Sequence, residues 1–472
     1  MQWLWGERFR QFLLVATGLI LTSCASYTQE TRSARALFET GDYERAATLY
    51  KRDAEEPGKD QVLGLLDYST SLYLAHDFEK SRSSLDFVEQ LMEYKDYTSL
   101  EHEAMSLLTS AQSEVYQGED FEKLMVNVIW AIGYLEEHNW EEALVECRKM
   151  DYKLYRMKEE GKRPWNQLPI ARYLSALAWE TAGDWDNAYI DYKKALELVP
   201  EFPLLREDLI RLARLAGRGG ERKKWEGEFH LKGEAKRYSR PLRSSQEGEI
   251  ILIYENGLAP AKVPSPVSYR IPVFSPIPKR YRQAVLMAKP AAALKEEKEP
   301  VLLASDSTSQ KDESSENNLE TGITVKLVTA EPKKEAKADT SYSYHRKTEL
   351  LFNLEETAIQ QLKTKMATIV GKRVGGVILK EVISNQVEKK TNSPVLGGLT
   401  RLALHLSDQA DTRSWRTLPA EYQIARLRVP KGEYQIAVQK IDSFGGIDSP
   451  APLSGSFKIE AGKRYYFVHR GI

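Results

Sequence analysis

The chain has 472 residues, 42% of them hydrophobic and 29% charged, which is long enough for about three domains and ordinary for globular protein. Lys and Arg number 67 against 68 Asp and Glu. This balance lacks the basic footprint of nucleic-acid-binding proteins, so a nucleic-acid partner is excluded.

An apolar run of about a dozen residues ends at Cys24 and follows Arg8 and Arg10, the pattern of a secretory signal. It is shorter than the about 20 apolar residues that span a bilayer. Its end, Leu21-Thr22-Ser23-Cys24, resembles the lipobox of bacterial lipoproteins. The resemblance implies that residues 1–23 are removed and that Cys24 carries a diacylglycerol and a fatty acyl chain, with no other cofactor. An ordinary secretory peptide with an incidental Cys24 is the alternative.

No Asp follows Cys24, and by the same resemblance this points to the periplasmic face of the outer membrane rather than to the inner membrane. Residues 24–29 would form a short tether. Acylation of Cys24 leaves Cys147 as the one remaining cysteine, so no internal disulfide can form and packing must hold the fold. A buried small hydrophobe is a better interpretation of Cys147 than a reactive or metal-binding thiol.

Residues 30–216 contain a recurring pattern of a turn, an aromatic residue and a new helix. Its four copies are Gly41-Asp42-Tyr43-Glu44-Arg45-Ala46, His76-Asp77-Phe78-Glu79-Lys80-Ser81, His138-Asn139-Trp140-Glu141-Glu142-Ala143 and Gly183-Asp184-Trp185-Asp186-Asn187-Ala188. The last copy, with Tyr192, Ala195 and Pro200 following, resembles the tetratricopeptide repeat (TPR). We therefore expect a right-handed superhelix of about eight to ten helices whose concave face binds a peptide or protein.

Aromatic and basic residues gather between the third and fourth copies. They are Tyr152, Tyr155, Arg156 and Trp165. Because Tyr, Trp and Arg dominate binding hot spots, this stretch is a candidate contact surface for a partner. Packing of helix ends is the commoner role of such residues.

The composition changes after residue 216. Residues 217–290 are rich in proline and contain two expected strands, Glu249 to Tyr254 and Ser268 to Phe274. Residues 291–347 are charged and poor in aromatics, which predicts a largely disordered insertion, with a short strand at Ile323 to Thr329.

The C-terminal part begins with an expected helical hairpin over residues 348–410, made of Thr348 to Ser384 and Leu399 to Ala410. Residues 411–472 predict a small antiparallel sheet, which the strand Glu249 to Tyr254 would complete as a sandwich. The expected strands are Tyr422 to Val429, Tyr434 to Ile441, Ser454 to Ile459 and Arg464 to His469. The fold class is therefore α+β, a helical repeat domain followed by a β-domain that the insertion interrupts.

The most concentrated polar cluster precedes these strands and consists of Asp411, Arg413, Trp415 and Arg416. Guanidinium groups can pair with a carboxylate or stack on an indole ring, so a ligand- or partner-binding clamp is one interpretation. A structural latch that joins the helical hairpin to the following sheet is the favoured alternative.

The lipobox, the repeats and the segments GEIILIYENGLAP at 248–260 and QADTRSWRTLPAEYQIARLRVPKGEY at 409–434 together resemble an uncharacterised family of bacterial TPR lipoproteins. Some members are encoded near an outer-membrane lipoprotein that activates peptidoglycan synthases. The resemblance thus implies work in the cell envelope and no particular chemistry.

The seven histidines are scattered, and none has the spacing of a metal site. The leading hypothesis is a non-enzymatic scaffold, anchored by lipid, that holds an envelope protein or peptide on its repeats. The alternative is a regulator of peptidoglycan synthesis or an envelope enzyme that acts on peptidoglycan.

Overall fold

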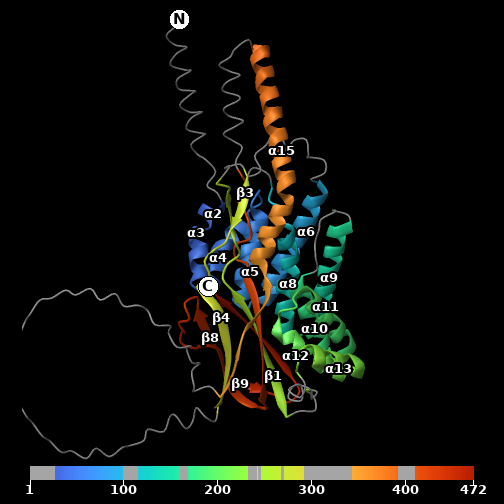
Figure 1. Cartoon of the computed structure of the whole chain (residues 1–472). Coiled ribbons are helices and arrows are strands. Elements are labelled where there is room, and N and C mark those ends of the chain that lie inside the picture. Colours follow the sequence, from blue (N-terminus) through green and yellow to red (C-terminus); the bar gives the residue numbers. More distant parts are fainter. Residues whose placement is uncertain are drawn as a thin grey trace, which may run out of the picture.

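The computed structural model describes residues 27–98, 115–159, 168–231, 242, 246–266, 271–291, 343–391 and 410–472. Helices of the N-terminal half lie along one side of a β-domain formed by the C-terminal half (Figure 1). Cys24 and Trp165 lie outside the described residues, as do the expected strand at 323–329 and most of the expected helix at 399–410.

The described N-terminal helices pack on their neighbours in the chain, as the repeat pattern predicts. They are α2 (Tyr27–Glu30), α3 (Arg32–Glu39), α4 (Tyr43–Glu55), α5 (Gln61–Leu74), α6 (Phe78–Thr98), α8 (Asp120–Glu136), α9 (Trp140–Glu159), α10 (Pro169–Ala182), α11 (Trp185–Leu198), α12 (Pro203–Leu215) and α13 (Gly219–Glu228). The small residue in each copy of the pattern is buried, which lets paired helices approach closely. These residues are Ala46, Ser81, Ala143 and Ala188.

The four turns share one geometry. In each, the first residue of the motif has a positive φ, +83° at Gly41, +61° at His76, +62° at His138 and +86° at Gly183. The next residue, Asp or Asn, donates its N–H to a carbonyl five residues back, the bond that closes a helix in a Schellman motif. Its side chain also accepts a backbone N–H of the next helix, so one residue ends one helix and begins another.

The helical part extends further than expected. Gly217 has a φ of +71° and closes α12 in the same way, and α13 then continues the array to residue 228. Trp225 of α13 is buried, and its indole N–H donates to the Tyr189 hydroxyl at 2.8 Å. The predicted boundary at residue 216 is therefore wrong, because a glycine pair after a helix can begin a new helix as well as end the domain.

The β-domain consists of two four-stranded sheets and a short hairpin. The first sheet has the order β10-β1-β7-β6 and the second has the order β5-β4-β8-β9, while β2 and β3 form the hairpin. The strands are β1 (Glu247–Asn256), β2 (Ala261–Pro264), β3 (Pro272–Ser275), β4 (Tyr281–Pro290), β5 (Tyr344–Lys347), β6 (Glu349–Asn353), β7 (Glu421–Pro430), β8 (Gly432–Asp442), β9 (Ala451–Ile459) and β10 (Arg464–Gly471).

The two sheets pack face to face as a sandwich. Ile250 and Leu252 of β1, Leu286 of β4 and Val438 of β8 meet in one buried cluster. This confirms the prediction that the strand after residue 248 completes a sandwich with the C-terminal strands. The sheets are not purely antiparallel, because β1 pairs with β10 in parallel. Strand β4, a central strand of the second sheet, has no counterpart in the sequence-based prediction.

Two boundaries in this part are corrected. The expected helix from Thr348 begins only at Leu354, where α15 (Leu354–Thr391) starts, because residues 349–353 pair with β7 as β6 and bury Leu351 and Phe352. The end of the expected insertion is also a strand, since β5 pairs with β4. Figure 1 shows α15 extending beyond the rest of the described chain.

Candidate functional site: the interface between the repeats and the sandwich

The first sheet contacts the helices α5, α8 and α10, and its Arg426 bonds to Asp208 of α12. Its apolar side chains share one continuous core with these helices; they include Ile251, Ile253, Tyr422, Ile424, Tyr466 and Val468. Polar contacts join the same surfaces, such as the 2.6 Å bond between the hydroxyls of Thr181 and Tyr466. The structure therefore corrects the expectation that this face of the repeats is open to a partner.

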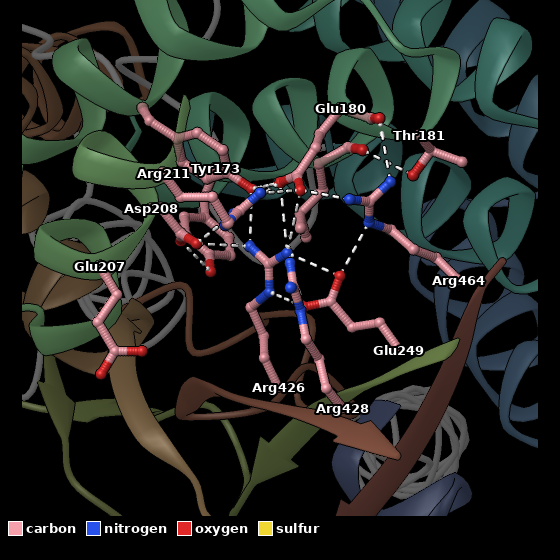
Figure 2. A network of polar contacts seen from close by, with 12 residues as sticks. Tyr173, Glu180, Thr181, Glu207, Asp208, Arg211, Glu249, Arg426, Arg428 and Arg464 are labelled. Carbon is pink, nitrogen blue, oxygen red and sulfur yellow. Dashed lines mark hydrogen bonds and ion pairs between the residues drawn. The ribbon is translucent and has the colours of Figure 1, made fainter. Parts of the chain in front are cut away.

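Glu180, at the end of α10, is the centre of a buried charge network (Figure 2). Its carboxylate accepts hydrogen bonds from Arg211 of α12 at 3.0 Å, from Arg426 of β7 at 3.3 Å and from the Tyr192 hydroxyl at 2.9 Å. Arg464 of β10 also contacts this carboxylate and donates to the Glu180 carbonyl oxygen at 3.1 Å. Glu180 thus joins three helices, α10, α11 and α12, to two strands, β7 and β10.

Two further carboxylates complete the network. Glu249 of β1 accepts from Arg426 at 3.0 Å and from Arg464 at 2.9 Å. Asp208 of α12 accepts from Arg426 at 2.8 Å and from Arg211 at 2.6 Å. Arg211 and Arg464 each contact two carboxylates and Arg426 contacts three, so each of these three arginines has a partner on another element.

Glu180 and Glu249 remain ionised at neutral pH. Burial alone would raise the pKa of Glu180, but Arg211, Arg426 and Arg464 hold it well below its usual value. The pKa of Glu249 is likewise lowered, because Arg426, Arg428 and Arg464 outweigh its burial. A pocket between α12 and β7 borders these groups, and Arg426 and Asp208 bond to each other across it. Its lining residues are Leu204, Glu207, Asp208, Arg211, Glu249, Arg426 and Arg428.

A second buried pair lies at the other end of β1. Arg470 of β10 donates to Glu255 through Nε at 2.9 Å and Nη2 at 2.6 Å. The Tyr73 hydroxyl of α5 donates to the same carboxylate at 3.2 Å, which ties the helix to the sheet. The interface thus has a paired carboxylate at both ends of β1, Glu249 and Glu255.

The predicted polar cluster lies in this interface. Arg413 donates to Asp411 through Nε at 2.9 Å and to Asp60, just before α5, through Nη1 at 2.9 Å. Trp415 is fully buried, and its indole N–H donates to the Thr70 hydroxyl of α5 at 3.0 Å, while its backbone N–H donates to Glu122 of α8 at 2.6 Å.

Arg416 is half-buried near Arg35 of α3 and Asp67 of α5, and burial followed by the charge of Arg35 lowers its pKa. The structure therefore brings Asp411, Arg413, Trp415 and Arg416 together as a latch. The latch joins the β-domain to the repeats rather than a helical hairpin to a sheet, and Asp411, Arg413 and Trp415 form its hydrogen bonds within the chain.

The other predicted contact residues that the structure describes lie on α9 and differ from the latch in their exposure. Tyr152 and Tyr155 are each 62% exposed on α9, and the Arg156 guanidinium lies 6.0 Å from the Tyr152 ring centroid. Cys147 on the same helix is buried, and burial raises the pKa of its thiol. Partner binding by Tyr152, Tyr155 and Arg156 stays a prediction.

Two buried carboxylates of the interface were not recognised from the sequence. Burial and the charge of Glu119 raise the pKa of Glu122 to about 7, although the Trp415 backbone N–H and the Tyr116 hydroxyl bond to it. Burial raises the pKa of Glu136 to about 8. Both lie on α8 among ordinary helix-forming residues, so nothing in the sequence marked them.

The sequence gives only a weak indication of the charged residues that form the network. Glu249 and Glu255 stand in a strand whose other side chains are mostly apolar, as do Arg464 and Arg470. A charged residue at a buried strand position needs a partner, so such positions predict ion pairs without naming the partners.

Among the described residues, no three His, Cys, Asp or Glu side chains are placed to hold a metal ion. None of the described helices is long and apolar enough to cross a membrane.

No family model matches the sequence, and no curated protein matches it. Solved structures similar to the chain include MamA of RS-1, an ArsTM double mutant, which is 16% identical over 44% of this chain and 92% of that one, with a TM-score of 0.29. A putative kinesin light chain of Podosopora anserina with nearly identical TPR-like repeats is 11% identical over 45% of this chain and 96% of that one, with a TM-score of 0.31.

A third similar structure is Bacillus thuringiensis PlcR in complex with the peptide PapR7 and DNA. It is 11% identical over 45% of this chain and 73% of that one, with a TM-score of 0.25. Scores this low carry no argument about function. The helical part is TPR-like on the strength of its own helix pairs and turns.

Proposed function

We propose that the chain is a lipoprotein, acylated at Cys24 and held on the periplasmic face of the outer membrane, that acts as a non-enzymatic scaffold for an envelope protein or peptide. The lipobox supports the anchor, and the TPR-like repeats support the scaffold. The partner would bind the outer surface of the repeats, because the β-domain already covers the inner one.

The observation that carries this proposal is an exposed stripe on α9. Val145, Arg148, Tyr152 and Tyr155 are spaced by three or four residues and therefore lie on one face of the helix. Val145 is 36% exposed and both tyrosines are 62% exposed. Aromatic and arginine side chains that remain in solvent on a rigid helix are what protein hot spots use.

The test is crosslinking in cells, followed by mass spectrometry of the affinity-tagged chain. We expect wild type to capture one envelope protein and the double variant Tyr152→Ala/Tyr155→Ala to lose it. Phe87→Ala is the matched control, because Phe87 is 45% exposed on α6 and lies outside the stripe. Capture that is unchanged by the double variant would overturn the proposed contact.

The anchor is tested separately with Cys24→Ala. We expect this variant to lose its acyl chains and leave the membrane fraction, since two or three chains are needed for stable anchoring. A variant that keeps its acyl mass or its membrane association would contradict acylation at Cys24.

A further inference from the structure

One aromatic side chain outside the repeats is almost entirely in solvent. Phe444, in the turn between β8 and β9, is 98% exposed, more than any other large hydrophobic side chain of the described residues. An exposed phenylalanine ring forgoes the free energy that its burial would release, and this free energy is available to a partner that covers the ring.

The turn holds Phe444 outward by its own hydrogen bonds. The Asp442 carboxylate accepts the backbone N–H of Phe444 at 2.8 Å and that of Gly446 at 2.7 Å. Gly445 has a φ of +89°, which favours glycine. The Ser443 hydroxyl donates to the Lys279 carbonyl at 2.7 Å, which fastens the turn to the chain before β4. The ring is therefore displayed by an ordered turn, and little entropy remains to be lost when it binds.

Cationic side chains surround the turn. Arg280 and Arg282 are exposed and Lys440 is half-buried. Arg280 and Lys440 lie 5.1 Å and 4.5 Å from the Tyr281 ring centroid. The nearby carboxylates of Asp442 and Asp448 already accept hydrogen bonds, the second from the Tyr281 hydroxyl at 2.7 Å. The Arg282 guanidinium lies against Gly445, the residue after Phe444. Arg280, Arg282 and Lys440 together carry one positive charge more than Asp442 and Asp448 balance.

The turn lies at the end of the sandwich that contacts the first helices. Leu258, Ile277 and Ile472 pack there against Phe38 of α3 and Tyr50 of α4. Figure 1 shows this end of the sandwich, with the C-terminus, beside α3 and α4. Tyr27 is the first described residue and lies three positions after Cys24, so the chain between them spans at most about 10 Å. A bilayer that holds acyl chains on Cys24 would therefore lie close to α2 and α3.

We propose that Phe444, with Arg280 and Arg282, forms a second membrane contact, in which the ring enters the boundary of headgroups and acyl chains and the guanidinium groups bind lipid phosphates. A single aromatic ring on an exposed turn can insert into the fluid headgroup region of a membrane. Protein hot spots, in contrast, lie at the centre of a larger packed patch. Only the nearness of a bilayer rests on the proposed function; the contact itself rests on the turn and its charges.

The test uses the mature chain from residue 24 with Cys24→Ser, so that acyl chains cannot mask the contact. Its partition onto vesicles of phosphatidylcholine with about one-third phosphatidylglycerol is compared with its partition onto phosphatidylcholine alone. We expect clear binding only to the anionic vesicles, lowered about tenfold by Phe444→Ser and about fivefold by Arg282→Gln. Phe87→Ser is the matched control and should bind like the parent chain.

Equal binding by Phe444→Ser and the parent chain, or no binding to anionic vesicles, would overturn the membrane contact. Substitution at a 98% exposed position leaves the packing intact, and an unchanged circular dichroism spectrum verifies the fold. If Phe444→Ser instead lost the crosslinked protein and kept its vesicle binding, the turn would be a protein contact and this proposal wrong. Loss of the scaffold role leaves vesicle binding unchanged, so the two proposals fail independently.

Discussion

Aromatic and arginine side chains occur at both the inner and the outer surface of the repeats, but in different surroundings. Against the inner surface, Trp415 and Arg426 of the β-domain are buried and bond to Thr70 and Asp208 of the repeats. On the outer surface, Tyr152 and Tyr155 of α9 remain in solvent. The comparison teaches that aromatic and arginine residues indicate a contact surface but do not show what it contacts. That depends on whether another part of the chain covers the surface.

The ion pairs at the two surfaces also differ in their burial. Inside, Glu180 and its arginines are within a few per cent of complete burial, where an unpaired charge is costly. Outside, pairs such as Arg82 with Glu137 keep 23% and 35% of their side chains exposed, and water screens them. The predictions below test this contrast.

The largest effect is expected from Glu180→Gln. This change leaves Arg211, Arg426 and Arg464 in a buried interface with one carboxylate fewer, so we expect the free energy of unfolding to fall by about 3–5 kcal/mol. Urea denaturation measures it. Glu137→Gln is the control and should cost less than about 1 kcal/mol. A loss at residue 180 no larger than that at residue 137 would refute the contrast between inside and outside.

The stability of the protein should also depend on pH through Glu136 and Glu122. Their pKa values are raised, whereas that of Glu180 is lowered. Their folded pKa values, about 8 and about 7, lie above the 4.5 of an ordinary glutamate, so between pH 4.5 and these values the folded state holds more protons than the unfolded state. Stability from these groups is therefore present at low pH and falls as pH rises from about 5 to 8, by at most about 1.4 kcal/mol per pH unit for each.

The measurement is urea denaturation at several pH values for wild type and Glu136→Gln, which cannot titrate. We expect the difference between the two to change by about 2–3 kcal/mol in favour of the variant as pH rises to 8. Glu180 and Glu249 do not interfere, because their lowered pKa values affect stability only in acid. Parallel pH profiles for the two proteins would contradict a raised pKa at Glu136.

A smaller effect is expected from Trp415→Phe. The ring remains apolar, but the indole hydrogen bonds to Thr70 and Thr417 are lost and a small cavity is left. The free energy of unfolding should fall by about 2 kcal/mol. Thermal and urea denaturation check this, and a change below about 0.5 kcal/mol would show that the latch contributes little to stability.

The smallest effect on stability is expected from Tyr152→Ala/Tyr155→Ala. Both side chains are 62% exposed, so unfolding should change by less than about 0.5 kcal/mol per residue. The same urea measurement checks this, and a loss as large as that of Trp415→Phe would mean that the outer tyrosines pack in the fold.

Much of the fold could be predicted from local patterns. The aromatic that begins each repeat helix and the Asp or Asn before it fixed α4, α6, α9 and α11, because capping depends on neighbours in sequence. Alternation predicted β7, β8 and β10 to within a few residues. Strand β6 was missed, since Leu351 and Leu354 also fit a helical spacing and only pairing with β7 separates the two.

The site was harder to predict, because its members are far apart in the chain. Asp411, Arg413, Trp415 and Arg416 were recognised as one cluster because they are adjacent in sequence. Glu180 and Arg426, 246 residues apart, could not be paired without the fold. The parallel pairing of β1 with β10 likewise joins segments more than 200 residues apart.

The sequence by itself determined the elements and their ends: the repeat helices, their capped turns and most strands, all set by residues within a few positions of each other. Only the tertiary structure decided that the β-domain covers the inner face of the repeats, which carboxylates meet which arginines, and which aromatic side chains stay in solvent. The physical reason is that burial and ion pairing depend on distances through space. A sequence specifies those distances only through the complete fold.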